Sequence, residues 1–260
     1  MKKMNEHKPF IIGMIHLPAT LTYKGWPGLK KYIDKAKKDL KALEAGGVDA
    51  ALLENDADSP CQVRGEGDVV APMAIVAHEL KKIAKIPLGV EVLLNDPKAS
   101  LAIAKTCGLG FIRTDYFVDR MTRKGYGEFE IDPKGIMKYK KKINAANIKI
   151  FADVQVKHAT MINKSKTIST SVKQAIKEGV DGVIVSGILT GTQPNIDDVK
   201  EANEAAAGKT SVLIGSGFSE ANVEKLLKYA DGAIVGSSVK RGGKVDSKKV
   251  ASLMKLVKKS

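Results

Sequence analysis

The amino-acid sequence predicts a (β/α)8 barrel of the TIM-barrel class, and three observations lead to this fold. Eight short apolar runs alternate with eight segments of helical periodicity over about 250 residues, as in known barrels. Several runs are continuous rather than alternating, which is typical of parallel strands buried on both faces. An acidic residue precedes three of the runs, at Asp49, Asp181 and Asp231, and marks a repeated turn from helix to strand.

The strands are predicted from their β-branched and apolar composition and from the turn residues that bound them. They are expected at residues 10–16, 49–54, 88–94, 110–114, 149–156, 182–186, 211–215 and 232–236. The alternative architecture is an open, doubly wound sheet. It is the weaker alternative because no Gly-x-Gly-x-x-Gly pattern follows the first strand.

The first two helices are predicted from apolar stripes. Between positions 29 and 43, apolar residues recur at intervals of three and four, and Gly46-Gly47 ends the helix. Met73, Val76 and Leu80 form the second stripe. Both segments are therefore expected to pack one face against the sheet.

The next two helices are predicted from their first turns. Asp96 and Asp132 are each followed by proline, the pattern of an N-cap before a proline at the first helical position. The last four helices carry apolar stripes within residues 172–176, 196–202, 223–227 and 250–257. Ser219 is the predicted N-cap of the third of these four.

Composition excludes several classes of protein. The 260 residues are 43% hydrophobic, which rules out wholesale disorder. The two cysteines, Cys61 and Cys107, cannot form a disulfide-stapled scaffold or a four-cysteine zinc site. The longest apolar runs fall short of the roughly 20 residues that span a bilayer, and the N-terminus lacks the pattern of a signal peptide. We expect one domain over residues 1–260 in the cytoplasm.

The net charge of +14 comes almost entirely from lysine. Of the 43 basic residues only five are arginines, and the lysines are spread over nearly every predicted helix. Proteins that recognise nucleic acids specifically rely on arginine and concentrate positive charge in one patch. We therefore expect a solvated lysine surface and no specific nucleic acid partner, with weak attraction to polyanions as the alternative. Assembly of several copies of the chain stays open.

Polar residues gather where the predicted strands end. In a barrel the carboxyl ends of the strands and the loops after them form the active site. The candidates there are His16, Glu54, Glu91, Asn95, Arg113, Asp115, Asp153 and Ser186. No known metal-binding spacing is present, so no cofactor is predicted, although these carboxylates and histidines keep a hard divalent metal as an alternative.

The segment from Asp153 to His158 is the strongest catalytic candidate. Alternation along a strand predicts that Asp153, Gln155 and Lys157 share one face. Lys157 is suited to anchor an anion or to act as base or nucleophile, Asp153 to hold it or act as base, and His158 to move protons. Glu54 is expected to assist. The alternative is a buried salt bridge between Asp153 and Lys157.

Two glycine–serine turns follow the seventh and eighth predicted strands. The loops at these two places, with a helix N-terminus, commonly bind phosphate in barrels, since glycine lets the backbone approach the anion. The predicted phosphate-binding residues are Gly215, Ser216, Gly217, Gly236, Ser237 and Ser238. The serine hydroxyls are expected to act as hydrogen-bond donors. The alternative is a pair of tight turns that merely require glycine.

Four further loops are candidates for a role at the barrel mouth. Those at residues 18–28, 55–67 and 116–131 are long and follow predicted strands, which favours a functional or mobile role. The loop at 186–192 is small and flexible enough to cover a ligand.

Several motifs together resemble the BtpA family over roughly residues 10–257. They include the segments at 13–18, 47–55, 89–96 and 152–159, together with the two glycine–serine turns. The resemblance implies a phosphate-binding TIM barrel and relates the chain to a cyanobacterial factor needed for photosystem I accumulation. Two residues depart from the family pattern: Glu91 stands where a smaller or different polar residue is expected, and Gln155 where a histidine is expected. The latter leaves no titratable group at that position.

Two functions from different classes follow. The first is an enzyme acting on a phosphorylated, nucleoside-like or sugar-phosphate molecule, by aldol, isomerase or glycosidic-bond chemistry. The second is a non-enzymatic assembly or regulatory factor built on a barrel scaffold. The convergence of polar side chains at one rim favours the enzyme, because a scaffold has no need of them.

Overall fold

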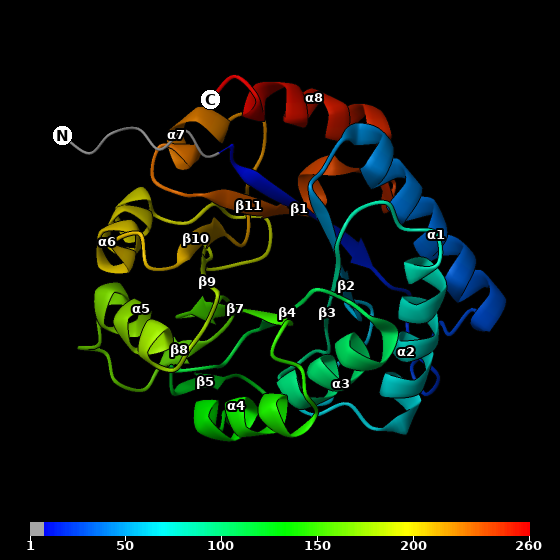
Figure 1. The fold of residues 1–260 in the computed structure, drawn as a ribbon, viewed down its shortest axis with the longest axis horizontal. Coiled ribbons are helices and arrows are strands. Elements are labelled where there is room, and N and C mark those ends of the chain that lie inside the picture. The colour runs from blue at the N-terminus through cyan, green and yellow to red at the C-terminus, as the bar shows by residue number, and fades with distance from the viewer. Residues whose placement is uncertain (1–7) are drawn as a thin grey trace.

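Eight parallel strands close into a barrel with neighbours in the order β1-β11-β10-β9-β7-β4-β3-β2 (Figure 1). The structure, a computed structural model, describes residues 8–260; residues 1–7, the start of the N-terminal segment that lacks the pattern of a signal peptide, lie outside the described residues. The barrel strands are β1 (Phe10–His16), β2 (Ala50–Glu54), β3 (Leu88–Glu91), β4 (Phe111–Thr114), β7 (Lys149–Val154), β9 (Gly182–Val185), β10 (Ser211–Ile214) and β11 (Gly232–Val235). This confirms the predicted TIM barrel.

The helices surround the barrel, as Figure 1 shows. They are α1 (Leu29–Gly46), α2 (Gly67–Lys81), α3 (Pro97–Cys107), α4 (Pro133–Lys142), α5 (Ile168–Lys177), α6 (Ile196–Ala206), α7 (Val223–Leu227) and α8 (Ser247–Val257), with a 3-10 turn η1 (Ser237–Val239). None of the helices in the described part of the chain is long and apolar enough to cross a membrane.

The predicted helix starts are confirmed in two cases and wrong in one. The Asp96 carboxylate accepts a hydrogen bond from the Ala99 amide, and Asp132 caps α4 in the same way. Ser219 does not cap α7: the helix begins after Asn222, whose side-chain oxygen accepts a hydrogen bond from the Ser219 amide. The Asn222 side chain therefore closes this turn, and α7 begins three residues later than a Ser219 cap would place it.

Two strands end more than one residue earlier than predicted, and side chains explain where. After Glu91, the amides of Val92 and Leu93 donate to Ser100 Oγ and Asn55 Oδ1, at 2.9 and 2.8 Å, so β3 leaves the ladder. After Val154, Gln155 adopts a φ of 49° and its amide donates to an Asp119 carboxylate oxygen at 2.8 Å. These turns point the following residues into the loops at the barrel mouth.

The barrel interior is filled by side chains, so its axis is a packed core and not a channel. Two phenylalanine rings, Phe111 and Phe151, meet edge to face with centroids 5.5 Å apart. Each ring lies over a glycine on a neighbouring strand, since a Cβ on Gly89 or Gly182 would come within 2.2 or 2.5 Å of it. Above this layer the barrel mouth becomes polar.

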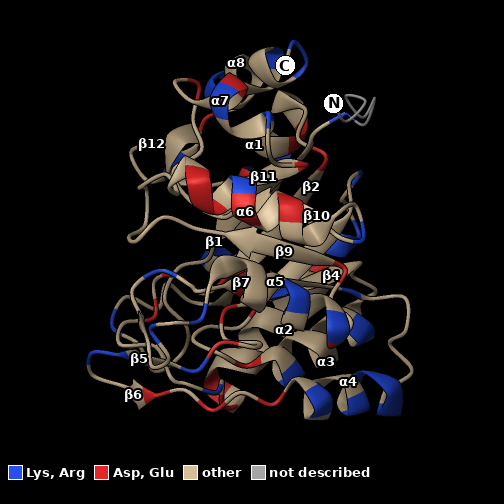
Figure 2. Cartoon of the chain, turned by 90° about the vertical axis from the view of Figure 1, so that its left-hand side faces the viewer, with Lys and Arg blue, Asp and Glu red and all other residues tan. Residues whose placement is uncertain are grey.

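Two small sheets are added at the mouth. The long loop after β4 is ordered as a hairpin of β5 (Met121–Arg123) and β6 (Gly127–Glu128), and β5 also pairs with β8 (Thr160–Met161) from the loop after β7. After η1, β12 (Lys240–Arg241) and β13 (Lys244–Val245) form a hairpin. Figure 2 shows that basic residues lie on several helices, α2, α3 and α4 among them, and that α6 carries both signs of charge.

Candidate functional site

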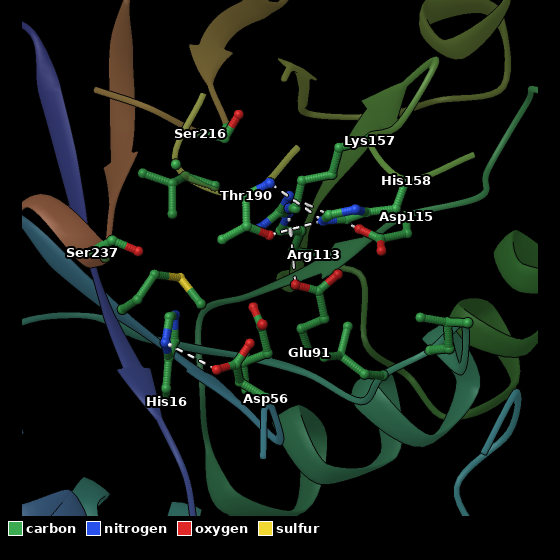
Figure 3. A pocket seen from close by; sticks show the side chains of 18 of the residues that line it. His16, Asp56, Glu91, Arg113, Asp115, Lys157, His158, Thr190, Ser216 and Ser237 are labelled. Atoms are coloured by element: carbon green, nitrogen blue, oxygen red, sulfur yellow. Dashed lines mark hydrogen bonds and ion pairs between the residues drawn. The ribbon is translucent and has the colours of Figure 1, made fainter. Parts of the chain in front are cut away.

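The candidate site is a cavity of about 510 Å³ at the carboxyl ends of the barrel strands. Residues from β1 to β4, from the loops after β7, β9, β10 and β11, and from the β5 strand line it. Figure 3 shows acidic and basic side chains converging on it. Its volume is in the range of known small-molecule sites, about 300–1,000 Å³.

Barrel register sets the first row of polar side chains. His16 pairs with Glu54 across β1 and β2, and Glu54 pairs with Glu91 across β2 and β3. Each is the last residue of its strand, so the three lie side by side at the rim of the core. All three line the cavity. The predicted convergence of these residues is therefore what the register produces.

Arg113 is the cation at the centre of the cavity floor. Its Nε and Nη2 atoms donate to the two Asp153 oxygens at 2.7 and 3.0 Å, and Ser186 Oγ donates to the same carboxylate at 3.0 Å. Glu91 lies 3.6 Å and Asp115 3.9 Å from the guanidinium. Asp153 thus accepts three hydrogen bonds, two of them from Arg113.

Burial and neighbouring charges shift the pKa values of the floor carboxyl groups in different directions. Burial raises the pKa of Glu91 well above its usual range, and the nearby carboxylates oppose the lowering effect of Arg113. Burial also raises the pKa of Asp115. Burial acts to raise the pKa of Glu54 as well, but the Coulombic effects of His16, Arg113 and Lys157 together outweigh it, so this pKa is lowered. Such pairs mark acid and base assignments in enzyme sites.

The side chains of the segment after β7 lie in different environments, some in the cavity and some outside it. Gln155 does not share a face with Asp153 and Lys157, which corrects the prediction: its side-chain amide donates to the Lys166 carbonyl at 3.0 Å, away from the cavity. Its positive φ breaks the strand alternation on which the prediction relied. Lys157 lines the cavity and forms no ion pair within residues 8–260, so a salt bridge from Asp153 to Lys157 is also wrong.

His158 lies at the outer edge of the cavity. It is exposed, adopts a φ of 63°, and its Nε2 is 2.9 Å from Thr190 Oγ1. Thr190 belongs to the loop at 186–192, and Gly191 of the same loop also lines the cavity. This loop therefore borders the cavity, as expected for a segment that covers a ligand.

The two glycine–serine turns form the opposite wall. All six predicted residues, Gly215 to Gly217 and Gly236 to Ser238, line the cavity. Gly217 has a φ of 65° and lies so close to the Gln193 backbone that a Cβ would come within 2.1 Å of its nitrogen. Ser237 starts η1, and neither its amide nor that of Gly217 donates a hydrogen bond within the described chain.

The three serines of these turns differ in what they offer. The Ser216 hydroxyl donates to the Thr192 carbonyl and accepts from the Gly187 amide, both at 2.8 Å, so it is not the free donor that we expected. Ser237 is exposed and directed into the cavity (Figure 3). The buried Ser238 Oγ has no hydrogen-bond partner within the described residues.

Two other predicted residues have neighbours that the sequence did not reveal. Asn95 does not line the cavity; its Oδ1 lies 3.4 Å from both Thr114 Oγ1 and the Tyr116 amide and orders the loop. His16 does line it, and its Nδ1 is 2.5 Å from the Lys240 ammonium. Burial lowers the pKa of His16.

Several polar residues that line the cavity were not predicted as site residues, among them Asp56, Arg123, Tyr126 and Thr190. Asp56 lies 3.4 Å from His16 Nδ1, and Arg123 and Tyr126 come from the hairpin after β4. Three of them belong to loops whose length was the available signal. Within the described part of the chain, no three His, Cys, Asp or Glu side chains are arranged to hold a metal ion.

The comparison with known families matches this picture. The profile of the BtpA family matches residues 6–259. This chain belongs to the BtpA family. The photosystem I biogenesis protein BtpA of Synechocystis is 37% identical over 243 residues, which cover 92% of this chain and 83% of that protein.

Solved structures of lower identity share the fold of this BtpA-family chain. The N-(5′-phosphoribosyl)anthranilate isomerase of Pyrococcus furiosus has a TM-score of 0.58 at 16% identity, covering 97% of this chain and 100% of that chain. The thiamine phosphate pyrophosphorylase of the same organism has a TM-score of 0.60 at 13% identity, covering 97% and 96%. At such identities the likeness shows the barrel.

Proposed function

We propose that this BtpA-family protein is an enzyme that acts on a phosphorylated small molecule, a sugar phosphate or a nucleoside-like phosphate. One observation carries the proposal: a single cavity has a wall of glycine–serine turns opposite a floor of buried carboxylates and cations. The first surface suits a phosphate and the second suits the chemistry of a polar carbon skeleton. A molecule with both parts fills both.

The phosphate end is supported by the geometry of the turns after β10 and β11. Free amides at the start of a helical turn carry partial positive charge and bind anions. Ser237 offers such an amide and a hydroxyl group, and Gly217, in the turn after β10, adds an amide that donates no hydrogen bond within the described chain. The two fold neighbours described above are named for phosphorylated compounds, which agrees with this assignment.

At the reactive end we assign roles to three residues. Lys157, with no ion-pair partner within residues 8–260, orients an anionic or carbonyl oxygen; Glu54, whose pKa is lowered, serves as the base. His158 contacts the substrate at the mouth, where it is held by Thr190. Asp153 positions Arg113. These roles suit isomerase, aldol and glycosidic-bond chemistry.

The test is a titration calorimetry series at fixed salt with D-ribose 5-phosphate, D-ribose and inorganic phosphate. We expect the phosphate ester to bind, free phosphate to compete and D-ribose to bind at least about tenfold more weakly, since one lost charge-assisted contact is worth that much. Ser237→Glu places a negative charge between the glycine–serine turns and should abolish binding. Ser165→Glu, on an exposed loop residue outside the cavity, is the matched control.

Two results would count against the proposal. The first is equal binding of D-ribose and its phosphate. The second is the absence of binding for this ester and for a panel of hexose phosphates and nucleoside monophosphates, in a protein that unfolds cooperatively.

A second candidate function is supported by sequence identity. The 37% identical Synechocystis relative is named for photosystem I biogenesis, so an assembly role without catalysis is the alternative for this chain. The cavity variants separate the two: Lys157→Ala and Ser237→Glu should leave an assembly function intact. Loss of cellular function in both variants, at unchanged protein level, favours the enzyme.

A further inference from the structure

The cavity floor holds four carboxyl groups, and two permanently charged cations, Arg113 and Lys157, act on them. Four carboxyl groups surround Arg113: Glu54 from β2, Glu91 from β3, Asp115 from the end of β4 and Asp153 from β7. Each is at most 8% exposed. Buried like charges at such distances cannot all be ionised, because each lacks the solvent that would screen it. At least one of these groups must hold a proton.

Hydrogen bonding distinguishes the four groups. Asp153 takes both strong bonds that Arg113 offers to the floor. Glu91 is 2% exposed, and neither of its oxygens accepts a hydrogen bond from a donor within the described residues; a protonated Glu91 lies within reach of the Glu54 carboxylate. Its separation of 3.6 Å from Arg113 Nε is too long for a hydrogen bond. It also stands directly opposite Glu54 in the strand register.

We propose that Glu91 is a protonated carboxylic acid at neutral pH and is the group that donates a proton to a substrate oxygen, with Glu54 as the neighbouring carboxylate. The donor role rests on the proposed function, whereas the protonation does not. An unpartnered carboxylate in this place would be strongly unfavourable, but a neutral acid needs only one acceptor for its O–H group. Glu91 lines the cavity, so a bound ligand can supply that acceptor.

The proton transfer is balanced within the site. The O–H bond of Glu91 breaks as a new O–H bond forms to a carbonyl or leaving-group oxygen of the substrate, and the electron pair of the broken bond stays on Glu91. The resulting carboxylate faces the Arg113 guanidinium 3.6 Å away, which stabilises the new charge. A proton returned from the product side or from water restores the acid.

Infrared difference spectra between the ligand-free wild type and its variants test whether Glu91 is protonated. At pH 7 we expect a carbonyl band of a protonated carboxyl group that is absent from Glu91→Gln and retained in Asp115→Asn, the matched control. The glutamine amide mimics the neutral acid in shape, so the variant should fold. Absence of the band, or its loss in Asp115→Asn and persistence in Glu91→Gln, would overturn the proposal.

The pH dependence of stability is an independent check. The pKa of Glu91 is raised in the folded chain, so between about pH 4.3 and that raised pKa the folded state holds more protons than the unfolded state. The free energy of unfolding therefore falls as the pH rises through this range. Glu91→Gln lacks this loss, so its stability relative to the wild type should increase with pH. A difference that is constant with pH contradicts the protonation.

The donor role is tested with D-ribose 5-phosphate as the probe. Glu91→Gln keeps an N–H donor and should bind the probe as the wild type does, whereas Glu91→Leu should bind about tenfold more weakly. Equal binding by the leucine variant would contradict the donor role. If the wild type itself does not bind, the proposed function fails while the infrared and pH results still decide the protonation.

Discussion

The two ends of the cavity are built by different means. The floor between β1 and β7 is made of charged side chains that hold one another, with Arg113 bound by Asp153 at 2.7 and 3.0 Å. The opposite wall, after β10 and β11, is made of backbone brought close by glycines such as Gly217. The floor is thus fixed by charge pairing, and the wall by chain conformation. Variants at the two ends should therefore fail in different ways.

The largest effect is expected at Arg113. Replacing it by methionine leaves Asp153 buried without its partner, and breaking such a pair costs about 3–5 kcal/mol. Urea denaturation monitored by circular dichroism measures this loss. The double variant Arg113→Met with Asp153→Leu should regain part of the stability, since it removes the carboxylate that Arg113 binds most closely, although Glu91 and Asp115 still lose their cation. A loss below about 1 kcal/mol in the single variant would mean that the pair does not hold the floor together.

Gly217→Ala probes the opposite wall. The new Cβ meets the backbone of Thr192 and Gln193, and the positive φ adds strain, so we expect a loss of about 1–3 kcal/mol together with loss of phosphate binding. Gly243→Ala is the control, because Gly243 also has a positive φ but open space around it. If denaturation shows the two variants to be equally stable, close approach of the chain does not shape this wall.

Lys157→Ala separates binding from stability. Lys157 is half-buried and has no ion-pair partner within residues 8–260, so its loss should change stability by no more than about 0.5 kcal/mol. Binding of D-ribose 5-phosphate should nevertheless fall, as calorimetry would show. A large loss of stability would instead assign Lys157 to the structure of the floor.

The smallest effect concerns His16. Burial lowers the pKa of His16 below its usual 6.5, so protonation of the unfolded chain removes stability as pH falls below about 6.5. Lys240 contributes to the lowering, and Lys240→Met should therefore raise the pKa. Nuclear magnetic resonance titration of the ring measures both values. An unchanged pKa in the variant would show that the Lys240 contact does not control His16.

The barrel could be predicted from sequence because its signals are local. Continuous apolar runs, helix periodicity and the Asp96 and Asp132 caps each depend on a few neighbouring residues. Strand ends could not be predicted where a backbone amide bonds to a distant side chain. The Gln155 amide, for example, donates to Asp119, which is 36 residues away in the sequence. No local pattern contains that bond.

The site could be predicted only as a set of residues at one rim. That His16, Glu54 and Glu91 end three neighbouring strands follows from the barrel arithmetic. The barrel arithmetic does not predict which carboxylate pairs with Arg113, because that depends on distances across the floor. The division between Asp153, held by Arg113, and Glu91, which accepts no hydrogen bond from the described residues, emerges only from the three-dimensional arrangement.

A crystal structure with D-ribose 5-phosphate bound tests the central claim, that one molecule spans both ends of the cavity. We predict the phosphate between the Gly217 and Ser237 amides and a sugar oxygen within hydrogen-bond distance of Glu91. A phosphate bound instead by Lys157 and Arg123, with the glycine–serine turns empty, would contradict the account.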